Sequence, residues 1–239
     1  MKKNRIWELD AFRGLCLIGM VIVHGIYDVV ELYGLIPWQY PPVFLAVKDW
    51  GGVLFLLLSG VCVTLGSRNL RRGALVFGAG QLVTLVTFAM ERLGFVGSGF
   101  TIWFGVLHCL GLCMMVWSLF RALPGSVLTA LGVGIVALGL VMGGITVDFP
   151  WLIPLGLCPA TYSSADYFPL LPNLGFFLLG AAAGRRLYRE KTTLFPKVNE
   201  NSLPIRFLTG CGKLSLWIYL LHQVVLCAVL ELITILMRM

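Results

Sequence analysis

The first residues in the chain that are suited to chemistry are an acid and a base, Asp10 and Arg13, which lie three positions apart within residues 8–14. At helical spacing both side chains face the same way. An apolar stretch follows, and His24 lies eleven residues beyond Arg13, which is about 16 Å further along a helix. A bilayer core is about 30 Å thick. The pattern therefore predicts a charged pair at one membrane edge and an imidazole near the midplane.

The other two histidines also fall inside apolar stretches. His222 is nine residues from Lys213, and His108 is thirteen residues from Arg121, so they lie about 14 Å and about 20 Å from those basic ends. We therefore expect three imidazoles from three helices to meet in the middle third of the membrane. Imidazole can act as a general base near neutral pH. Each ring could instead be a neutral histidine hydrogen-bonded across a helix interface.

Further polar side chains lie toward the outer ends of apolar stretches. Asp28 and Tyr27 stand one turn beyond His24 on the same face, and Asp28 could orient that ring or a substrate, or simply lie at the interface. Asp166 precedes the sixth stretch, where capping the helix N-terminus could by itself explain it. The candidate substrate contacts are Tyr27, Asp49, Asp166, Tyr167 and His222.

Arginines gather at the inner ends of the apolar stretches, at positions 13, 68, 71 and 72. Guanidinium groups bind phosphate in a bidentate manner. We therefore consider Arg13, Arg68, Arg71 and Arg72, with Asp10 orienting Arg13, as a site for an anionic ligand. Basic loops also set membrane topology whatever they bind, and Asp10 with Arg13 could be a structural pair, so both of these interpretations stay open.

The composition indicates what carries these groups. Of the 239 residues, 59% are hydrophobic and only 12% are charged, whereas a soluble domain carries about 25% charged residues. This favours an all-α polytopic protein that forms one domain, residues 1–239, in a lipid bilayer. The net charge of +7 does not indicate nucleic acid, because the basic residues lie in short connections between apolar stretches. The seven cysteines form no Cys-x-x-Cys pair and predict neither disulfides nor a metal site.

We count seven transmembrane helices, at residues 10–30, 44–66, 73–90, 101–120, 126–145, 168–187 and 212–237. Residues 191–206 form a polar linker before the last of them. Because the first stretch contains charged residues and no clean cleavage site follows it, we interpret it as a retained helix rather than a signal peptide. With the N-terminus in the cytoplasm, only Lys48, Arg92 and Arg238 of the 18 basic residues fall outside. This asymmetry predicts a cytoplasmic N-terminus and an external C-terminus.

Five stretches in order resemble a known family. They are Arg5 with 9–14 (LDAFRG) and 20–24 (MVIVH), 54–60 (LFLLLSG), 104–111 (FGVLHCLG), 165–172 (ADYFPLLP) and 212–223 (GKLSLWIYLLHQ). Together they resemble bacterial membrane proteins related to heparan-alpha-glucosaminide N-acetyltransferase. The opening Leu-Asp-x-x-Arg-Gly with a later His is also similar to the broader transmembrane acyltransferase group.

The resemblance implies transfer of an acetyl group from cytoplasmic acetyl-CoA to the amine or hydroxyl of a sugar, without a metal, in a bacterial inner membrane. Coenzyme A, a polyanion, would bind the inner arginines, and His24, His108 and Asp28 would be the catalytic groups. In the lysosomal enzyme the position matching His24 is Asn, and the catalytic His lies about three turns later. Residues 35–38 here read LIPW. Either His24, alone or with His108, supplies the base, or this branch lacks that chemistry.

Two other classes of protein compete with an acyltransferase. Mid-membrane His and Asp side chains are also the parts of a proton relay, which would make the protein a proton-coupled transporter of small molecules. The absence of an internal repeat and the odd number of helices fit poorly with inverted-repeat transporters. The third class is a structural protein whose polar groups only hold helices together. Glycine-lined helix faces would allow a homodimer.

Overall fold

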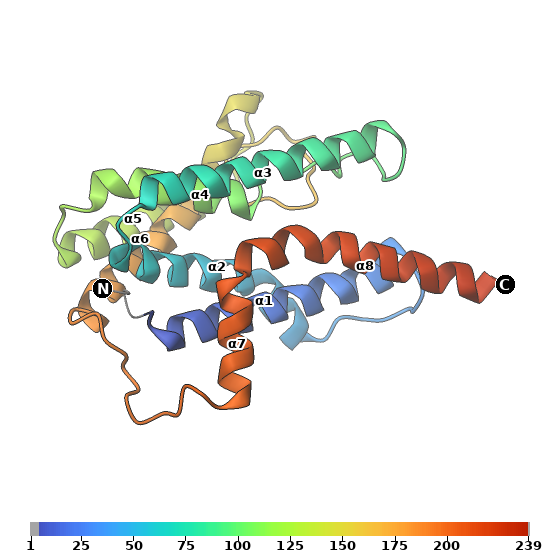
Figure 1. The fold of residues 1–239 in the computed structure, drawn as a ribbon. Coiled ribbons are helices and arrows are strands. Elements are labelled where there is room, and N and C mark those ends of the chain that lie inside the picture. Colours follow the sequence, from blue (N-terminus) through green and yellow to red (C-terminus); the bar gives the residue numbers. More distant parts are fainter. Residues whose placement is uncertain (1–4, 239) are drawn as a thin grey trace. The chain divides into compact units, whose positions relative to one another are not determined.

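The computed structural model describes residues 5–238 (Figure 1). Lys2 and Lys3, which contribute to the predicted charge asymmetry, lie outside the described residues. Within residues 5–238 the chain is helical, with two isolated β-bridges and no β-strand, as the all-α prediction requires. The fold divides into two compact units, and of the two boundaries along the chain one falls inside a helix and the other in the connection between two helices. Unit 1 comprises Met1–Phe55 and Thr192–Met239, and unit 2 comprises Leu56–Lys191. The expectation of a single membrane domain remains a prediction.

Unit 1 is built on the first and last long helices of the chain. Helix α1 (Trp7–Tyr27) continues into a π-helical turn, η1 (Asp28–Leu32), and packs along α8 (Ser215–Arg238) (Figure 1). Helix α2 (Pro42–Leu65) starts in this unit. Helix α7 (Leu203–Lys213) crosses α1 steeply (Figure 1). The pairing of α1 with α8 is what positions the histidines of this unit.

The crossing of α1 and α7 depends on two glycines. A Cβ atom on Gly14 would lie 2.0 Å from the carbonyl oxygen of Leu208, and one on Gly212 would lie 1.9 Å from that of Asp10. Neither position can hold a side chain unless the helices move apart. The two backbones therefore touch directly, which is how small residues allow close helix packing. No helix is expected from the sequence at residues 203–211, so α7 is an addition to the predicted fold.

Unit 2 contains the remainder of α2 and four further helices. They are α3 (Asn69–Arg92), α4 (Val106–Phe120), α5 (Gly125–Met142) and α6 (Leu170–Leu187), with a short 3₁₀ turn, η2 (Pro150–Leu155), between the last two. Helix α3 packs on α4, α5 packs on α6, and α4 also contacts α6. Gly132 and Gly175 let α5 and α6 approach closely, because a Cβ on Gly175 would lie 2.6 Å from the carbonyl oxygen of Gly132.

The helices are those of an integral membrane protein. Within the described chain, five are long and apolar enough to cross a bilayer, and α4 is apolar but only 15 residues long. The five are Trp7–Leu32, Pro42–Leu65, Asn69–Arg92, Gly125–Met142 and Ser215–Met237. The predicted seventh span, 212–237, is divided between two helices, because α7 ends at Lys213, the chain turns at Leu214 and α8 begins at Ser215. The count of seven spans and the cytoplasmic N-terminus stay predictions.

Candidate active site

Two of the three histidines form a direct hydrogen bond in unit 1. His24 Nδ1 on α1 lies 2.8 Å from His222 Nε2 on α8, and His222 Nδ1 lies 2.6 Å from the carbonyl oxygen of Tyr219. A carbonyl only accepts, so His222 Nδ1 carries a hydrogen. If both rings are neutral, His222 Nε2 must then accept the hydrogen of His24 Nδ1. The remaining lone pair of the two rings is on His24 Nε2, which makes that atom the one able to take up a proton.

A carboxylate and an amide pair one turn further along the same two helices. Gln223 Nε2 lies 2.8 Å from Asp28 Oδ2 and 3.0 Å from Asp28 Oδ1, so its amide donates to the carboxylate. Asp28 is only 2% exposed, and an unpaired carboxylate at such a position would be costly. Asp28 is also the first residue of the π-helical turn η1, an irregularity frequent at functional sites. We call His24, His222, Asp28 and Gln223 the polar seam.

Near the polar seam lie a hydrogen-bonded tyrosine, an exposed tyrosine and an apolar groove. Tyr33 donates a hydrogen bond to the carbonyl oxygen of Cys227 (3.2 Å), which ties the end of η1 to α8. Tyr27, a predicted substrate contact beside Asp28, is 46% exposed. An apolar groove of about 620 Å³ is lined by residues on both sides of His24 in the chain, among them Val21 and Gly25. The polar seam thus adjoins an apolar surface within unit 1.

At the other end of α1, Asp10 binds two arginines. Arg5 donates to both carboxylate oxygens (2.7 and 2.9 Å), and Arg13 donates to one of them (3.2 Å). The Asp10 side chain is 7% exposed, whereas those of Arg13 and Arg5 are 18% and 54% exposed. The predicted Asp10–Arg13 pair exists, but Arg5 is the closer partner. Two guanidinium groups against one carboxylate leave one net positive charge in this group of residues, which we call the Asp10 cluster.

The other predicted arginines lie in unit 2. Arg68 is the N-cap residue of α3, and Arg71 and Arg72 belong to its first turn. All three are exposed, as expected of solvated basic residues at a helix end. Arg13 belongs to unit 1, so the predicted four-arginine site remains a prediction.

The third histidine, His108, has a different environment in unit 2. It is 1% exposed in the first turn of α4, and its Nδ1 accepts the backbone N–H of Gly105 (3.2 Å). Its Nε2 lies 3.3 Å from Thr84 Oγ1, and that hydroxyl donates to the carbonyl oxygen of Ile102 (2.5 Å). Both ring nitrogens therefore have partners that hold the loop before α4 against α3. These contacts fit an interhelical structural histidine, and the catalytic role expected of His108 stays a prediction.

The prediction that Asp166 caps the N-terminus of α6 is wrong, because its carboxylate caps a different helix. Asp166 Oδ2 accepts the N–H of Val106 (3.0 Å), so the carboxylate caps α4 rather than α6. The N-cap position of α6 is occupied by Pro169, which provides no side-chain cap. The loop carrying Asp166 runs beside residue 104, because the N–H of Phe168 donates to the carbonyl oxygen of Phe104. The approach of these two segments decides which helix is capped.

The last two predicted substrate contacts, Tyr167 and Asp49, have different environments. Tyr167 donates to the carbonyl oxygen of Ile153 (2.7 Å) and accepts from the thiol of Cys158 (3.0 Å). Burial raises the pKa of Tyr167 above its usual range, so its hydroxyl stays protonated as a donor. Asp49 is exposed on α2. Among the described residues, no group of three His, Cys, Asp or Glu side chains is arranged to hold a metal ion.

Sequence reasoning missed two residues of these clusters. Gln223 was not proposed as a site residue, although an amide inside an apolar stretch and next to His222 was a usable signal. Arg5 was not proposed as the partner of Asp10, because its distance of five positions is not a helical spacing. The chain enters α1 only after Ile6, and this extended entry lets Arg5 fold back onto the carboxylate.

Comparison with known proteins identifies the family of this chain. The family described as "Heparan-alpha-glucosaminide N-acetyltransferase, catalytic" matches residues 5–224, a range that includes the polar seam and the Asp10 cluster. No curated protein and no solved structure matches the chain. The family match covers far more than half of the 239 residues. The chain therefore belongs to the heparan-alpha-glucosaminide N-acetyltransferase catalytic family, a family of membrane acetyltransferases.

Proposed function

We propose that the protein transfers an acetyl group from acetyl-CoA to the amine or hydroxyl of a sugar, with His24 as the general base. The observation that carries the proposal is the hydrogen bond between His24 and His222. It orients the His24 ring and, in the neutral pair, leaves the lone pair on His24 Nε2. A positioned imidazole of this kind contributes about 10²–10⁴-fold to a proton-transfer step.

The proposed reaction needs no group besides the two substrates. The acceptor nitrogen or oxygen attacks the thioester carbonyl carbon, and His24 Nε2 takes the proton that the acceptor loses. The carbon–sulfur bond then breaks, and the coenzyme A thiolate takes that proton from the His24 imidazolium. His222 stays hydrogen-bonded to His24 Nδ1 and stabilises the positive charge on the ring while it lasts.

Asp28 and Gln223 have a supporting part in the proposal. The Asp28 carboxylate lies one turn from His24, where α1 continues into η1, and a negative charge there would offset the positive charge that the His24 ring carries during the proposed transfer. Gln223 holds that carboxylate through its amide. In this proposal Asp28 acts through its charge on the His24 ring and does not contact the acceptor.

For the donor, we propose that the phosphates of coenzyme A bind at the Asp10 cluster. The cluster has one net positive charge, and Arg13 is held at a defined position by Asp10. The protein would lie in a bacterial inner membrane. Its N-terminus would be cytoplasmic, so that the Asp10 cluster faces the cytoplasmic acetyl-CoA.

The transporter alternative is less favoured, because the chain belongs to an acetyltransferase family. One experiment tests the proposed transfer. Protein reconstituted in lipid nanodiscs is given acetyl-CoA with and without glucosamine, and free thiol and acetylated sugar are measured. We expect thiol release that depends on the sugar, with an equal amount of acetylated product. Solute movement in liposomes without loss of the thioester would instead favour transport and overturn the proposal.

A further inference from the structure

Helix α7 in unit 1 lies across α1 rather than along it (Figure 1). The contact is near the beginning of α1, where Gly212 of α7 meets the backbone of Asp10. Because α1 is long and apolar enough to cross a bilayer, its first turns lie at the edge of the bilayer core, and a helix that crosses it there runs along the membrane surface. With 11 residues, α7 is about 16 Å long, too short to cross the core itself.

The side of α7 that faces away from α1 carries exposed apolar side chains. Leu203 and Phe207 are four positions apart and therefore share a face of the helix, and they are 80% and 62% exposed. Thr209 and Gly212, the buried residues of α7, lie on the opposite side. An exposed apolar face on a helix at the membrane surface is typical of an interfacial helix, whose apolar side chains enter the acyl region of the bilayer.

Two basic side chains lie along one edge of this apolar face. Arg206 and Lys213 are seven positions apart, which is about two helical turns, so they project from the same side of α7. Both are exposed, and within residues 5–238 neither of them forms an ion pair. The helix contains no Asp or Glu. Its outer surface therefore combines apolar side chains with two positive charges that no carboxylate neutralises.

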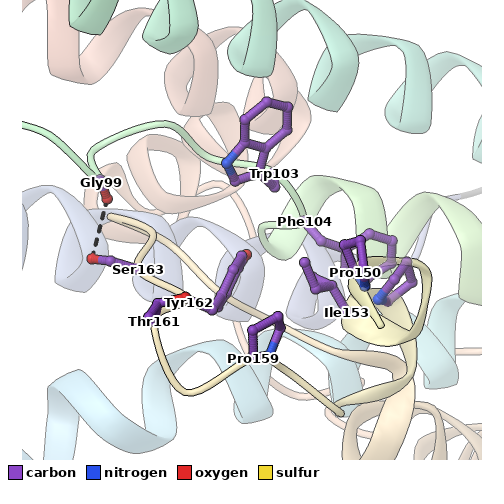
Figure 2. Close-up of a pocket in the computed structure, with 10 residues that line it drawn as sticks. Gly99, Trp103, Phe104, Pro150, Ile153, Pro159, Thr161, Tyr162 and Ser163 are labelled. Atoms are coloured by element: carbon purple, nitrogen blue, oxygen red, sulfur yellow. Dashed lines mark hydrogen bonds between the residues drawn. The ribbon is translucent and has the colours of Figure 1, made fainter. Parts of the chain in front are cut away.

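The loop pocket of unit 2 has no comparable feature. Ser163 Oγ donates to the carbonyl oxygen of Gly99 (3.3 Å) and joins two loops around a space of about 580 Å³ (Figure 2). Aromatic rings, prolines and hydroxyl groups line this space, and among the described residues the lining includes no acidic or basic side chain. Such a lining selects no one class of ligand. The charges of α7, in contrast, select an anion, and its apolar face selects an alkyl chain.

We propose that α7 is a binding site for an anionic phospholipid. The headgroup phosphate pairs with Arg206 and Lys213, and the acyl chains lie against Leu203 and Phe207. Each basic side chain near an anionic membrane surface strengthens binding about fivefold, so the two together give a preference for an anionic over a zwitterionic lipid. This site does not depend on the acetyl transfer proposed above.

The test is native mass spectrometry of the delipidated full chain titrated with phosphatidylglycerol. Phosphatidylcholine is the zwitterionic comparison, and glycerol 1-phosphate is a competitor that has the phosphate without acyl chains. The double variant Arg206→Gln/Lys213→Gln removes both positive charges of α7. Its matched control, Arg189→Gln/Lys197→Gln, removes the same charge from two exposed residues outside the helices. Phe207→Ser removes an apolar side chain and leaves the charges.

We expect the unaltered protein to bind phosphatidylglycerol about 30-fold more tightly than phosphatidylcholine. The double variant should lose most of this preference, whereas the control pair should keep it. Phe207→Ser should weaken the binding of both lipids alike. Because every substituted side chain is exposed, the variants should unfold at the temperature of the unaltered protein when no lipid is added, so a loss of binding is not a loss of folding.

Three results would overturn the proposal. The first is equal affinity of the unaltered protein for the two lipids. The second is an equal loss of preference in the double variant and the control pair, because the charge would then act without regard to its place on α7. The third is displacement of phosphatidylglycerol by glycerol 1-phosphate at the same concentration, because the ligand would then be a free phosphate and the apolar face would take no part.

Discussion

His24 Nδ1 and His222 Nε2 lie 2.8 Å apart although 198 positions separate them in the chain. The bond brings together residues from the first and the last long helix. Because the Tyr219 carbonyl accepts from the other nitrogen of His222, the two residues have different parts in the neutral pair. His24 has the proton-accepting nitrogen, and His222 orients it.

This difference predicts unequal effects of removing the two rings. His24→Ala should lower kcat by about 10²–10⁴-fold, while binding of acetyl-CoA is retained. His222→Gln, whose amide can still accept from His24 Nδ1, should lose less activity. Both are measured by thiol release and by calorimetric titration with acetyl-CoA. Full activity in His24→Ala would remove His24 from the mechanism.

The Asp28–Gln223 pair predicts a coupling in stability. Gln223→Leu leaves the buried Asp28 carboxylate without its amide donor and should cost about 1–3 kcal/mol. In the double variant with Asp28→Leu, most of that cost should disappear, because no carboxylate remains to be unpaired. Thermal unfolding of the two single variants and the double variant in the same lipid gives the coupling energy. Strictly additive effects would show that the two side chains do not stabilise each other.

The Asp10 cluster predicts where the donor binds. Arg13→Ala should weaken acetyl-CoA binding by about tenfold, a loss expected of one charge-assisted contact to a phosphate. The same variant should discriminate less between coenzyme A and dephospho-coenzyme A if Arg13 contacts the 3′-phosphate. Arg92→Ala is the control, because Arg92 is one of the three basic residues expected on the outer side. An unchanged dissociation constant in Arg13→Ala would exclude the phosphate role.

The crossing of α1 and α7 predicts a steric effect. Gly212→Ala places a methyl group against the backbone of Asp10 and should destabilise the protein by about 1–3 kcal/mol. Gly210→Ala, two positions earlier on the same helix, should be tolerated because no atom lies within 4 Å of the added Cβ. Thermal unfolding compares the two. If both variants behave alike, the backbone of α7 does not touch that of α1 at Gly212.

Asp166 allows its structural and functional roles to be separated. Asp166→Ala removes the bond to the Val106 N–H and should cost about 1 kcal/mol of stability. Asp166→Asn keeps an acceptor oxygen and should recover most of this loss. Activity assays on both variants, below their unfolding temperatures, then measure the KM for the acceptor and so test whether Asp166 contacts it. A raised KM for the acceptor in Asp166→Asn, at normal stability, would indicate that the carboxylate binds substrate as well.

The sequence alone determined the membrane class, the approximate position of most helices and the family. These features depend on local properties: the length of an apolar stretch, the placement of basic residues and short motifs such as residues 9–14. It also singled out His24, His222 and Asp28, since polar groups inside apolar stretches stand out without knowledge of the fold. The helix α7 was not predicted, because its 11 residues are too few to span a bilayer and carry no long apolar stretch.

The partners of these residues were decided by tertiary structure. That His24 meets His222, and that His108 instead holds a loop against α3, depends on how each helix is rotated and on what lies beside it. Asp166 caps α4 rather than α6 because the loop before α6 runs along the segment before α4. A hydrogen bond requires an approach within about 3.5 Å between two atoms in suitable directions. Distances of that kind between residues far apart in the chain arise only when the helices pack.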